Sequence, residues 1–420
     1  MRAVLVNTSD SGGAARAVCR LHLGLKLAGV DARMVVRDDF RHDPLIDGTS
    51  SLLGKISTRL APRVEWQPLR AYPHRDTEVW SSQWFPNNTA NRLRSLKADI
   101  IHLHWIGRGF LPIKAFSGLG RALVWTFHDM WGVTGGCHYD RDCGRWQHGC
   151  GFCPQLKSGI ENDWSRKTWQ SKERTWEDVP MHIVSPSRWL AGVVSSSRLF
   201  LNKPVHVIPN GLDMSVFRQY PKEAARLELD LPADRAVIVL GAESVLMDSR
   251  KGFQYLQPAL KRLSELGWRD KIAIAVFGAE QPVNEQDFGF PVHYMGQIQD
   301  DHKLALLYSA GDVFLAPSIQ DNLPNTVMEA IACGTPCVAF HIGGMPDLIE
   351  HQVNGYLAKP FEIEDLVRGI EWILSDKARY DMLRIKARES AVDRFSITTV
   401  VEQYKTLYKR VLDQKQKNNK

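Results

Sequence analysis

The 420-residue sequence has no long hydrophobic run. None approaches the about 18 apolar residues of a membrane-spanning helix. The first residues, MRAVLVNTSDSGG, lack the apolar core of a signal peptide, and no internal repeat or low-complexity tract is present. With 44% hydrophobic and 24% charged residues, the composition is that of a globular protein, and the length favours two domains. Together these features predict a cytoplasmic protein.

Acidic residues are scarce in the first half of the chain. Residues 1–205 hold 28 lysines and arginines but only 18 aspartates and glutamates, a balance of +10 against −4 for the remainder. A basic half suits an anionic partner such as a membrane surface, a lipid diphosphate or a nucleic acid. A peripheral position on the inner face of the cytoplasmic membrane is one expectation, and an ordinary solvated surface is the other.

Cysteine is also rare, but four of the seven cysteines fall within 17 residues. They have the spacing C-x5-C-x6-C-x2-C, at Cys137, Cys143, Cys150 and Cys153. In a cytoplasmic chain such clustering favours a metal over disulfides, and thiolates are typical ligands of structural zinc. We therefore expect a structural zinc, for which His138 or His148 could replace a cysteine ligand. Two disulfides, free packing thiols and an iron–sulfur cluster are the alternatives.

The first half reads as strands that alternate with helices and loops. Buried strands are predicted at residues 3–8, 99–106 and 122–127. The first leads into a turn at Gly12 and Gly13, which suits close approach of the backbone to an anion although the dinucleotide pattern GxGxxG is absent. His104 and His128 stand at the ends of the other two. Both are candidate site residues, because the carboxyl ends of strands in open α/β sheets face the ligand crevice.

The most informative stretch is residues 311–349, in which strand and helix patterns alternate twice. The strand VFLAP leads into a polar loop, and Pro324 precedes a helix that should end at Gly334. A second strand, TPCVAF, leads through HIGGMP to a helix expected to begin at Asp347. Two such loops at one sheet edge make an anion and ligand site, because helix N-termini present unpaired N–H groups.

This stretch contains two carboxylates, Asp321 and Glu329, and a glycine pair, Gly343-Gly344, after its second strand. With this pattern the sequence resembles the retaining glycosyltransferases of family 4. That family has the GT-B fold, an α/β architecture of two Rossmann-like parallel-sheet domains with a cleft between them. Its Glu-x7-Glu element falls on Asp321 and Glu329, with Asp in place of the first Glu. Its Lys-Gly signature falls on Lys251 and Gly252. The resemblance covers nearly the whole chain.

The resemblance implies roles for individual residues. Glu329 would hold the ribose hydroxyls of a nucleotide, Asp321 would lie near the donor sugar, and Lys251 would bind the donor diphosphate as a point charge. His128 would contact the donor sugar and completes the expected catalytic set. The expected donor-binding residues are Gly12, Gly13, Arg250, Asn322, Leu323, Asn325 and Thr326. Arg250 is included because the family's usual Arg just after the preceding strand has no counterpart in GAESVLM.

The implied reaction moves a sugar, with retention, from a UDP- or GDP-linked donor to a glycan or lipid-linked acceptor. The implied setting is the assembly of a bacterial surface polysaccharide or lipopolysaccharide. Phosphate binding in this fold class needs no metal, so any zinc would be structural, and no nucleic-acid partner is expected. The alternatives are a sugar-nucleotide epimerase on the same fold and a nucleic-acid-binding protein that uses the cysteine cluster.

The same resemblance predicts the domain organisation. A Rossmann-like acceptor domain would span residues 1–205 and include the cysteine loop at 135–155. A Rossmann-like nucleotide-sugar domain would span residues 206–394. Residues 395–420 would form a crossover helix and a basic tail.

Overall fold

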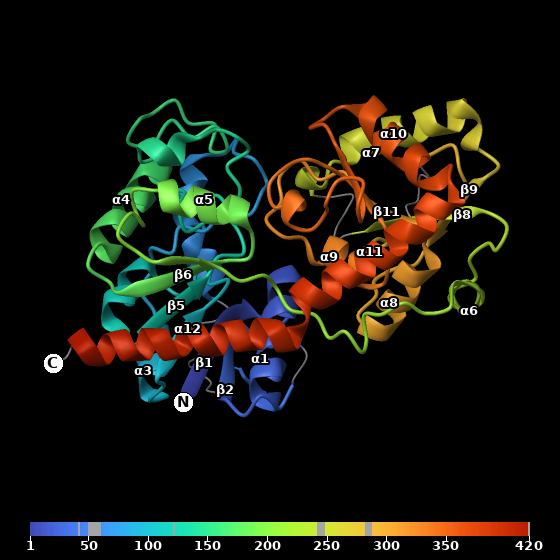
Figure 1. Ribbon diagram of the computed structural model, residues 1–420. Coiled ribbons are helices and arrows are strands. Elements are labelled where there is room, and N and C mark those ends of the chain that lie inside the picture. Colours follow the sequence, from blue (N-terminus) through green and yellow to red (C-terminus); the bar gives the residue numbers. More distant parts are fainter. Residues whose placement is uncertain (41–42, 49–59, 121, 242–247, 282–287, 419–420) are drawn as a thin grey trace. The chain divides into compact units, whose positions relative to one another are not determined.

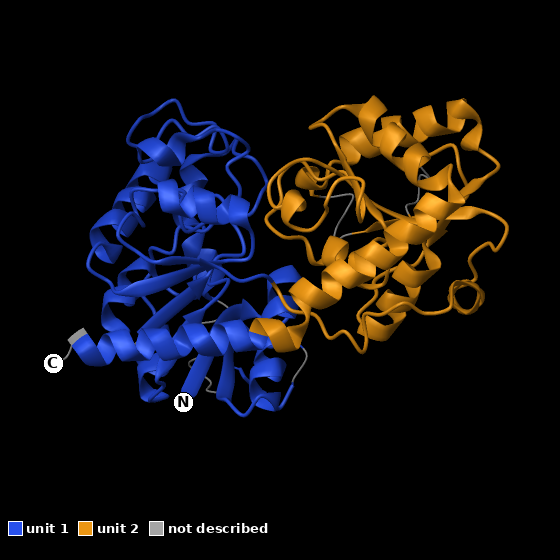
Figure 2. Ribbon diagram, viewed as in Figure 1, with its two compact units in different colours: residues 1–209, 401–420 blue, residues 210–400 orange. Residues whose placement is uncertain are grey.

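The protein is described by a computed structural model that covers residues 1–420 except 41–42, 49–59, 121, 242–247, 282–287 and 419–420. The chain forms two compact units, shown in different colours in Figure 2. Unit 1 comprises Met1–Pro209 and Val401–Lys420, and unit 2 comprises Asn210–Val400. The chain therefore leaves unit 1 between Pro209 and Asn210 and returns to it inside its last helix.

Unit 1 contains a seven-stranded sheet in the order β3-β2-β1-β4-β5-β6-β7; Figure 1 labels β1, β2, β5 and β6 of this sheet. The strands are β1 (Arg2–Ser9), β2 (Asp31–Asp38), β3 (Ile46–Asp47), β4 (Ile100–Leu103), β5 (Ala122–Thr126), β6 (Met181–Ser185) and β7 (Val205–Val207). Each neighbouring pair is parallel, with Ile100 of β4 opposite both Ala3 and Ala122. The nearly continuous apolar runs in these strands suit a parallel sheet that is covered on both faces.

The helices of unit 1 include α1 (Gly13–Leu27), α3 (Thr89–Ser95), α4 (Trp164–Trp176), α5 (Arg188–Ser196) and the part of α12 (Ile397–Asn418) from residue 401 onward. Short 3-10 turns lie at Gln67–Ala71, Ile113–Gly118 and Arg145–His148. The core on one side of the sheet is rich in aromatic rings: Trp125 packs edge-on against Trp176 and Phe127, at centroid distances of 5.2 and 4.5 Å. On the other side, buried polar side chains of β4 and β5 contact α12.

Unit 2 contains a six-stranded parallel sheet in the order β10-β9-β8-β11-β12-β13. The strands are β8 (Ala236–Gly241), β9 (Ile272–Phe277), β10 (Val292–Tyr294), β11 (Val313–Ala316), β12 (Cys337–Phe340) and β13 (Gly355–Ala358). The helices are α6 (Lys222–Glu228), α7 (Phe253–Leu263), α8 (Asp301–Ala310), α9 (Asn325–Ala332), α10 (Ile363–Leu374) and α11 (Lys377–Phe395). Single turns follow at Ser249–Lys251, Ser264–Trp268 and Met345–Asp347.

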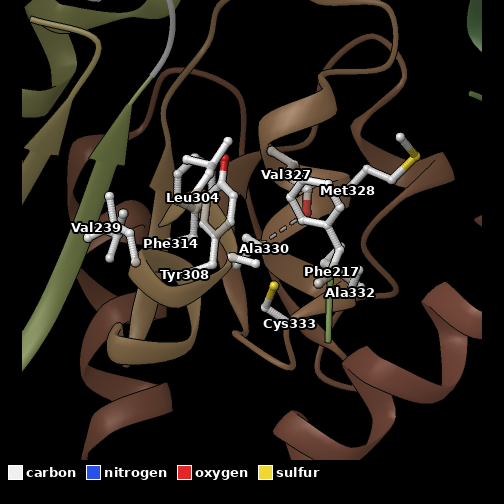
Figure 3. Close-up of a cluster of buried hydrophobic side chains, with 14 of the residues drawn as sticks. Phe217, Val239, Leu304, Tyr308, Phe314, Val327, Met328, Ala330, Ala332 and Cys333 are labelled. Carbon is white, nitrogen blue, oxygen red and sulfur yellow. Dashed lines mark hydrogen bonds between the residues drawn. The ribbon is translucent and has the colours of Figure 1, made fainter. Parts of the chain in front are cut away.

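Alternating residues of β8 show that the unit 2 sheet is buried on both faces. Val237 and Val239 belong to one apolar cluster, and Ile238 and Leu240 belong to the other. Figure 3 shows part of the first cluster, in which Tyr308 and other side chains of α8 meet α9. Because most residues of α9 are buried, this helix holds the loop that precedes it in a defined position.

The sequence predicts two helices within residues 311–349, of which the first is confirmed and the second is wrong. The helix α9 follows Pro324, and Gly334 has a φ of 70°, the left-handed conformation expected just after a helix end. The helix predicted from Asp347 is only a 3-10 turn at Met345–Asp347. It ends early because the Asn354 side chain accepts from the amide of Glu350 (2.8 Å) and donates to the carbonyl of Leu348 (3.1 Å). The anion site expected at this loop therefore lacks the helix N-terminus that would have presented its N–H groups.

The fold class predicted from the sequence is confirmed, since both units are α/β with an all-parallel sheet. Within the described ranges, no helix combines the length and apolarity needed to cross a bilayer.

Candidate active site

The loop between β11 and α9 carries a buried carboxylate paired with a lysine. Oδ2 of Asp321 accepts from Nζ of Lys251 at 2.6 Å, and Oδ1 accepts from the amide of Asn322 at 3.0 Å. Burial would raise the pKa of Asp321, but the charges of Lys251 and Arg250 outweigh it and lower that pKa below the ordinary carboxyl value. Asp321 is therefore ionised at neutral pH, and it holds the lysine ammonium next to the loop.

Arg250 is bound to the same loop through its backbone and its side chain. Its carbonyl accepts from the amide of Ile319 at 2.8 Å, and its Nη1 donates to the carbonyl of Gln320 at 3.3 Å. Its Nη2 pairs with Asp248 at 2.5 Å. The side chains of Lys251 and Arg250 are thus both bonded to the loop around Asp321. Residues 244–247, which the sequence places in the loop before Lys251, lie outside the described residues.

Two glycines allow this packing. Gly252 has a φ of 74°, and a Cβ there would lie 1.7 Å from the carbonyl oxygen of Pro317. Gly343 has a φ of 49°, and a Cβ there would lie 2.1 Å from the carbonyl oxygen of Asp321. That same oxygen accepts from the amide of Gly344 at 3.0 Å. The loop around Asp321 is thus held between two backbone segments that only glycine permits at this distance.

Glu329 lies inside α9 and is almost completely buried, with 1% of its surface exposed. Its Oε2 accepts from the hydroxyl of Tyr308 at 3.1 Å. At the start of the same helix, Oδ1 of Asn325 accepts from Nδ2 of Asn210 at 3.0 Å. Of the other predicted donor-binding residues in this region, Asn322 and Leu323 are buried and Thr326 is partly buried.

The remaining predicted residues belong to unit 1. Gly12, with a φ of 96°, precedes α1, which starts at Gly13 and has no side-chain cap. His128 follows β5, and its Nε2 lies 3.1 Å from Nδ1 of His104, which follows β4. The two adjacent parallel strands therefore bring together the two histidines that the sequence placed at strand ends.

Asp129, next to His128, is held by other groups. Its Oδ2 accepts from Nδ1 of His138 (2.6 Å) and from Nε1 of Trp105 (2.8 Å), and its Oδ1 accepts from the amide of Trp131 (2.8 Å). Burial would raise the pKa of Asp129, but these partners, His138 first, lower it. Nε2 of His138 in turn lies 3.0 Å from Oγ of Ser81. Sequence reasoning missed this series of hydrogen bonds, because no spacing motif links Ser81 to Asp129.

The cysteine loop, residues 135–155, comes after Asp129 in the sequence and contains His138. Cys137 and Cys153 are buried, and Cys143 and Cys150 are partly buried; all four are free thiols. Burial raises the pKa of Cys150 to about 12 and that of Cys153 to about 11. Within the part of the chain that the structure describes, no three Cys, His, Asp or Glu side chains are grouped as metal ligands.

A buried lysine supports the start of this loop. Nζ of Lys172 donates to the carbonyls of Trp131 and Thr134, the latter at 2.9 Å, and lies 3.7 Å from the centre of the Trp131 ring. Burial lowers the pKa of Lys172 to about 7, although the nearby thiols of Cys150 and Cys137 act in the opposite direction.

Comparison with known proteins gives one family for both units. The sequence profile described as "Glycosyltransferase Family 4" matches residues 11–216, and that described as "Glycosyl transferases group 1" matches residues 236–376. The putative colanic acid biosynthesis glycosyl transferase WcaC of Escherichia coli is 27% identical over 59% of this chain and 58% of its own length. The sulfoquinovosyl transferase of Arabidopsis thaliana is 29% identical over 50% of this chain and 40% of its own length. The chain thus spans about half the length of the curated relatives it matches.

Solved structures share the fold across the whole chain. Sucrose-phosphate synthase from Thermosynechococcus elongatus superposes with a TM-score of 0.71 at 18% identity, covering 98% of this chain and 100% of that one. WaaG, a glycosyltransferase involved in lipopolysaccharide biosynthesis, has a TM-score of 0.63 at 16% identity and covers 96% of this chain and 98% of its own. Two parallel-sheet units of this topology, each matched by a glycosyltransferase profile, show that the chain belongs to glycosyltransferase family 4, with the GT-B fold.

Proposed function

We propose that the protein transfers a sugar, with retention of anomeric configuration, from a nucleotide-diphosphate donor to a glycan or lipid-linked acceptor. The observation that carries this proposal is the ion pair between the partly buried Lys251 and the buried Asp321, in a loop packed against Gly252 and Gly343. An ammonium held in place by a carboxylate, with an arginine beside it, is suited to binding a diphosphate.

The chemistry requires positive charge in a defined position. Cleavage of a sugar–diphosphate bond builds negative charge on the leaving group, and a preorganised cation stabilises that charge without having to reorganise during the reaction. Lys251 meets this requirement, because its ammonium is paired with Asp321 in the packed loop. The amide of Leu323, before α9, would add a hydrogen bond to the sugar or the diphosphate, whereas the amide of Asn322 already donates to Asp321.

Glu329 would bind the ribose of the nucleotide. A carboxylate can accept from two vicinal hydroxyls, and Tyr308 already orients this one by donating to Oε2. Because Glu329 sits within a fully packed helix, its position is set by the core and not by a flexible loop.

The relatives suggest the donor and the pathway class. Solved structures of HepE from Anabaena hold UDP, UDP with glucose, or UDP-glucose, which favours a UDP-linked donor here. One E. coli relative is named a UDP-Gal:alpha-D-GlcNAc-diphosphoundecaprenol alpha-1,3-galactosyltransferase, and another a putative colanic acid biosynthesis glycosyl transferase. A lipid-linked acceptor in bacterial surface polysaccharide or lipopolysaccharide assembly follows as the proposed setting, and the basic residues of 1–205 would favour an anionic membrane surface.

A donor screen tests the proposal. Purified protein is incubated with UDP- and GDP-linked sugars, with and without a lipid-linked or soluble glycan acceptor, and released nucleotide is measured. Release that depends on acceptor supports transfer, and product anomers assigned by NMR test retention. Conversion of the donor to an isomer without acceptor would instead indicate an epimerase, and the proposal would be wrong.

The cysteine loop remains our proposed zinc site, with Cys137, Cys143, Cys150 and Cys153 as ligands. Its support is the concentration of four free thiols in one loop, near enough that each of the other three affects the pKa of Cys137. Binding would require thiols to turn toward one point and to lose their protons. Such a zinc would stabilise the loop and would take no part in the transfer reaction.

A further inference from the structure

His104 is a buried histidine with one nitrogen unused. It has 3% of its surface exposed, its Nδ1 lies 3.1 Å from Nε2 of His128, and the two rings stack with centroids 5.3 Å apart. Among the residues that the structure describes, Nε2 of His104 has no hydrogen-bond partner. Buried polar atoms without a partner are uncommon and destabilising, so one that is retained calls for a physical explanation.

The surroundings of His104 include a small pocket. Its polar lining residues are His104, Trp105, His128, Asp129 and His138. Asp129 and His138 are already bonded to each other at 2.6 Å, and Trp105 donates to the same carboxylate. Among these lining residues, His104 is therefore distinguished by a buried nitrogen without a partner, and it lies next to the histidine expected to contact the donor sugar.

The ring of His104 also packs against His102, whose own ring is fixed by hydrogen bonds. The ring of His102 lies 4.0 Å from that of His104, centre to centre. Nδ1 of His102 is 2.6 Å from the hydroxyl of Tyr408, and its Nε2 is 2.8 Å from Oγ1 of Thr126. Oγ1 of Thr126 is in turn 3.0 Å from the hydroxyl of Tyr404. Both tyrosines come from α12, so both nitrogens of His102 are held by groups that are themselves buried.

The three histidines are neutral at neutral pH. Burial lowers the pKa of His102 to about 3 and that of His128 to about 4, and it lowers the pKa of His104 well below the usual value. A neutral imidazole has one N–H donor and one acceptor nitrogen. Whichever nitrogen donates between His104 and His128, Nε2 of His104 is left either as an acceptor or as a donor. A hydroxyl group can pair with it in both cases.

We propose that His104 is a substrate-contacting residue whose Nε2 hydrogen-bonds a hydroxyl of the transferred sugar, and that His102 and Tyr408 are positioning residues for it. The inference rests on the proposed function and adds a second histidine beside His128. It explains why a nitrogen is kept at a buried position that an apolar ring could otherwise fill. It also gives α12 a role in the site, because the hydroxyl of Tyr408 reaches His104 only through His102.

The test compares His104→Phe with wild type, using the nucleotide sugar selected by the donor screen. We expect kcat/KM to fall roughly 10- to 100-fold, the scale of one lost hydrogen bond to a buried group. Calorimetry should show weaker binding of the nucleotide sugar and unchanged binding of the free nucleotide. His104→Gln, whose amide can donate or accept, should recover part of the loss, and it serves as the test variant if His104→Phe melts far below wild type.

The positioning role is tested by a double-mutant cycle. Tyr408→Phe removes only the hydroxyl next to His102 and should lower kcat roughly 2- to 5-fold, with no further loss in the His104→Phe background. Tyr404→Phe is the matched control, because its hydroxyl contacts Thr126 and should have the smaller effect. Wild-type kcat/KM in a folded His104→Phe or His104→Gln variant would overturn this inference and leave the proposed function standing. A wild-type protein inactive with every donor would overturn the proposed function.

Discussion

The two units provide polar groups of opposite character. The loop around Asp321 in unit 2 is ionic, with Lys251 paired to Asp321 and Arg250 paired to Asp248. The histidines at the ends of β4 and β5 in unit 1 are neutral and form hydrogen bonds without a net charge. The difference matches what each would bind. A diphosphate requires fixed positive charge, whereas sugar hydroxyls require neutral donors and acceptors in a dry environment.

The largest expected effect breaks the ionic side of this comparison. Lys251→Ala should lower turnover by about two orders of magnitude or more, because it would remove the cation proposed to stabilise the leaving group. Lys251→Arg should recover only part of the activity, because the guanidinium has a different reach and geometry. Donor consumption at saturating donor, with acceptor present, is the measurement. The exposed Lys261 on α7 provides the control: Lys261→Ala should leave turnover unchanged. Wild-type turnover in Lys251→Ala would show that this loop is not the phosphate site.

The next effect concerns affinity for the nucleotide. Glu329→Ala should weaken binding of the free nucleotide by roughly 10-fold or more, the scale of losing a charge-assisted hydrogen bond. Tyr308→Phe, which removes only the orienting hydroxyl, should weaken it less. Calorimetry on folded variants is the measurement, with circular dichroism to confirm the fold. Unchanged affinity in Glu329→Ala would reject the ribose role.

The third prediction tests whether close backbone packing holds the ionic loop. Gly343→Ala should lower both turnover and the free energy of unfolding, the latter by roughly 1–3 kcal/mol, because Cβ would collide with the carbonyl of Asp321 at a positive φ. Gly192→Ala in α5 is the control, since a Cβ there meets nothing within 4 Å and the helix should gain slightly. Kinetics and thermal melting of both variants decide. Equal behaviour of the two glycines would contradict the packing argument.

The cysteine loop gives a smaller, structural effect. If zinc binds, elemental analysis of reduced protein should find about one zinc per chain, as expected for a four-ligand site. Cys150→Ser should then lower the zinc content and the melting temperature together. Cys19→Ser is the control, because that thiol lies in α1 outside the loop. Metal-free protein with full stability and activity would leave free packing thiols or reducible disulfides as the explanation.

The smallest effect distinguishes the neutral histidines from ordinary ones. Since burial lowers the pKa of His102 and His128 in the folded state, the unfolded chain takes up protons below about pH 6.5 that the folded chain refuses. Their contribution to stability is present above that pH and is lost as the pH falls toward the folded pKa values. Thermal melting between pH 8 and pH 5 should show this loss. His128→Gln should reduce the slope, and an unchanged slope would place the acid sensitivity elsewhere.

Sequence reasoning reached the elements of the site more reliably than their contacts. The strands, the position of α9 and the approximate places of Lys251, Asp321 and His128 follow from local patterns and from the family resemblance. The pairing of Lys251 with Asp321 does not, because the two residues are 70 positions apart and meet only when β8 and β11 lie side by side. The helix predicted at Asp347 fails for a related reason: Asn354, seven residues later, ends the turn through its side chain.

The sequence by itself determined the two α/β units, the strand-to-helix loops and the types of residue at the site. It could do so because hydrophobic periodicity, glycine and proline act over a few residues. Tertiary structure alone decided which polar groups are paired with one another. Asp129 became bonded to His138 and Trp105, and Tyr404 and Tyr408 came to lie next to β4 and β5 from the far end of the chain. Burial then set the charges, since the same histidines in water would titrate near neutral pH.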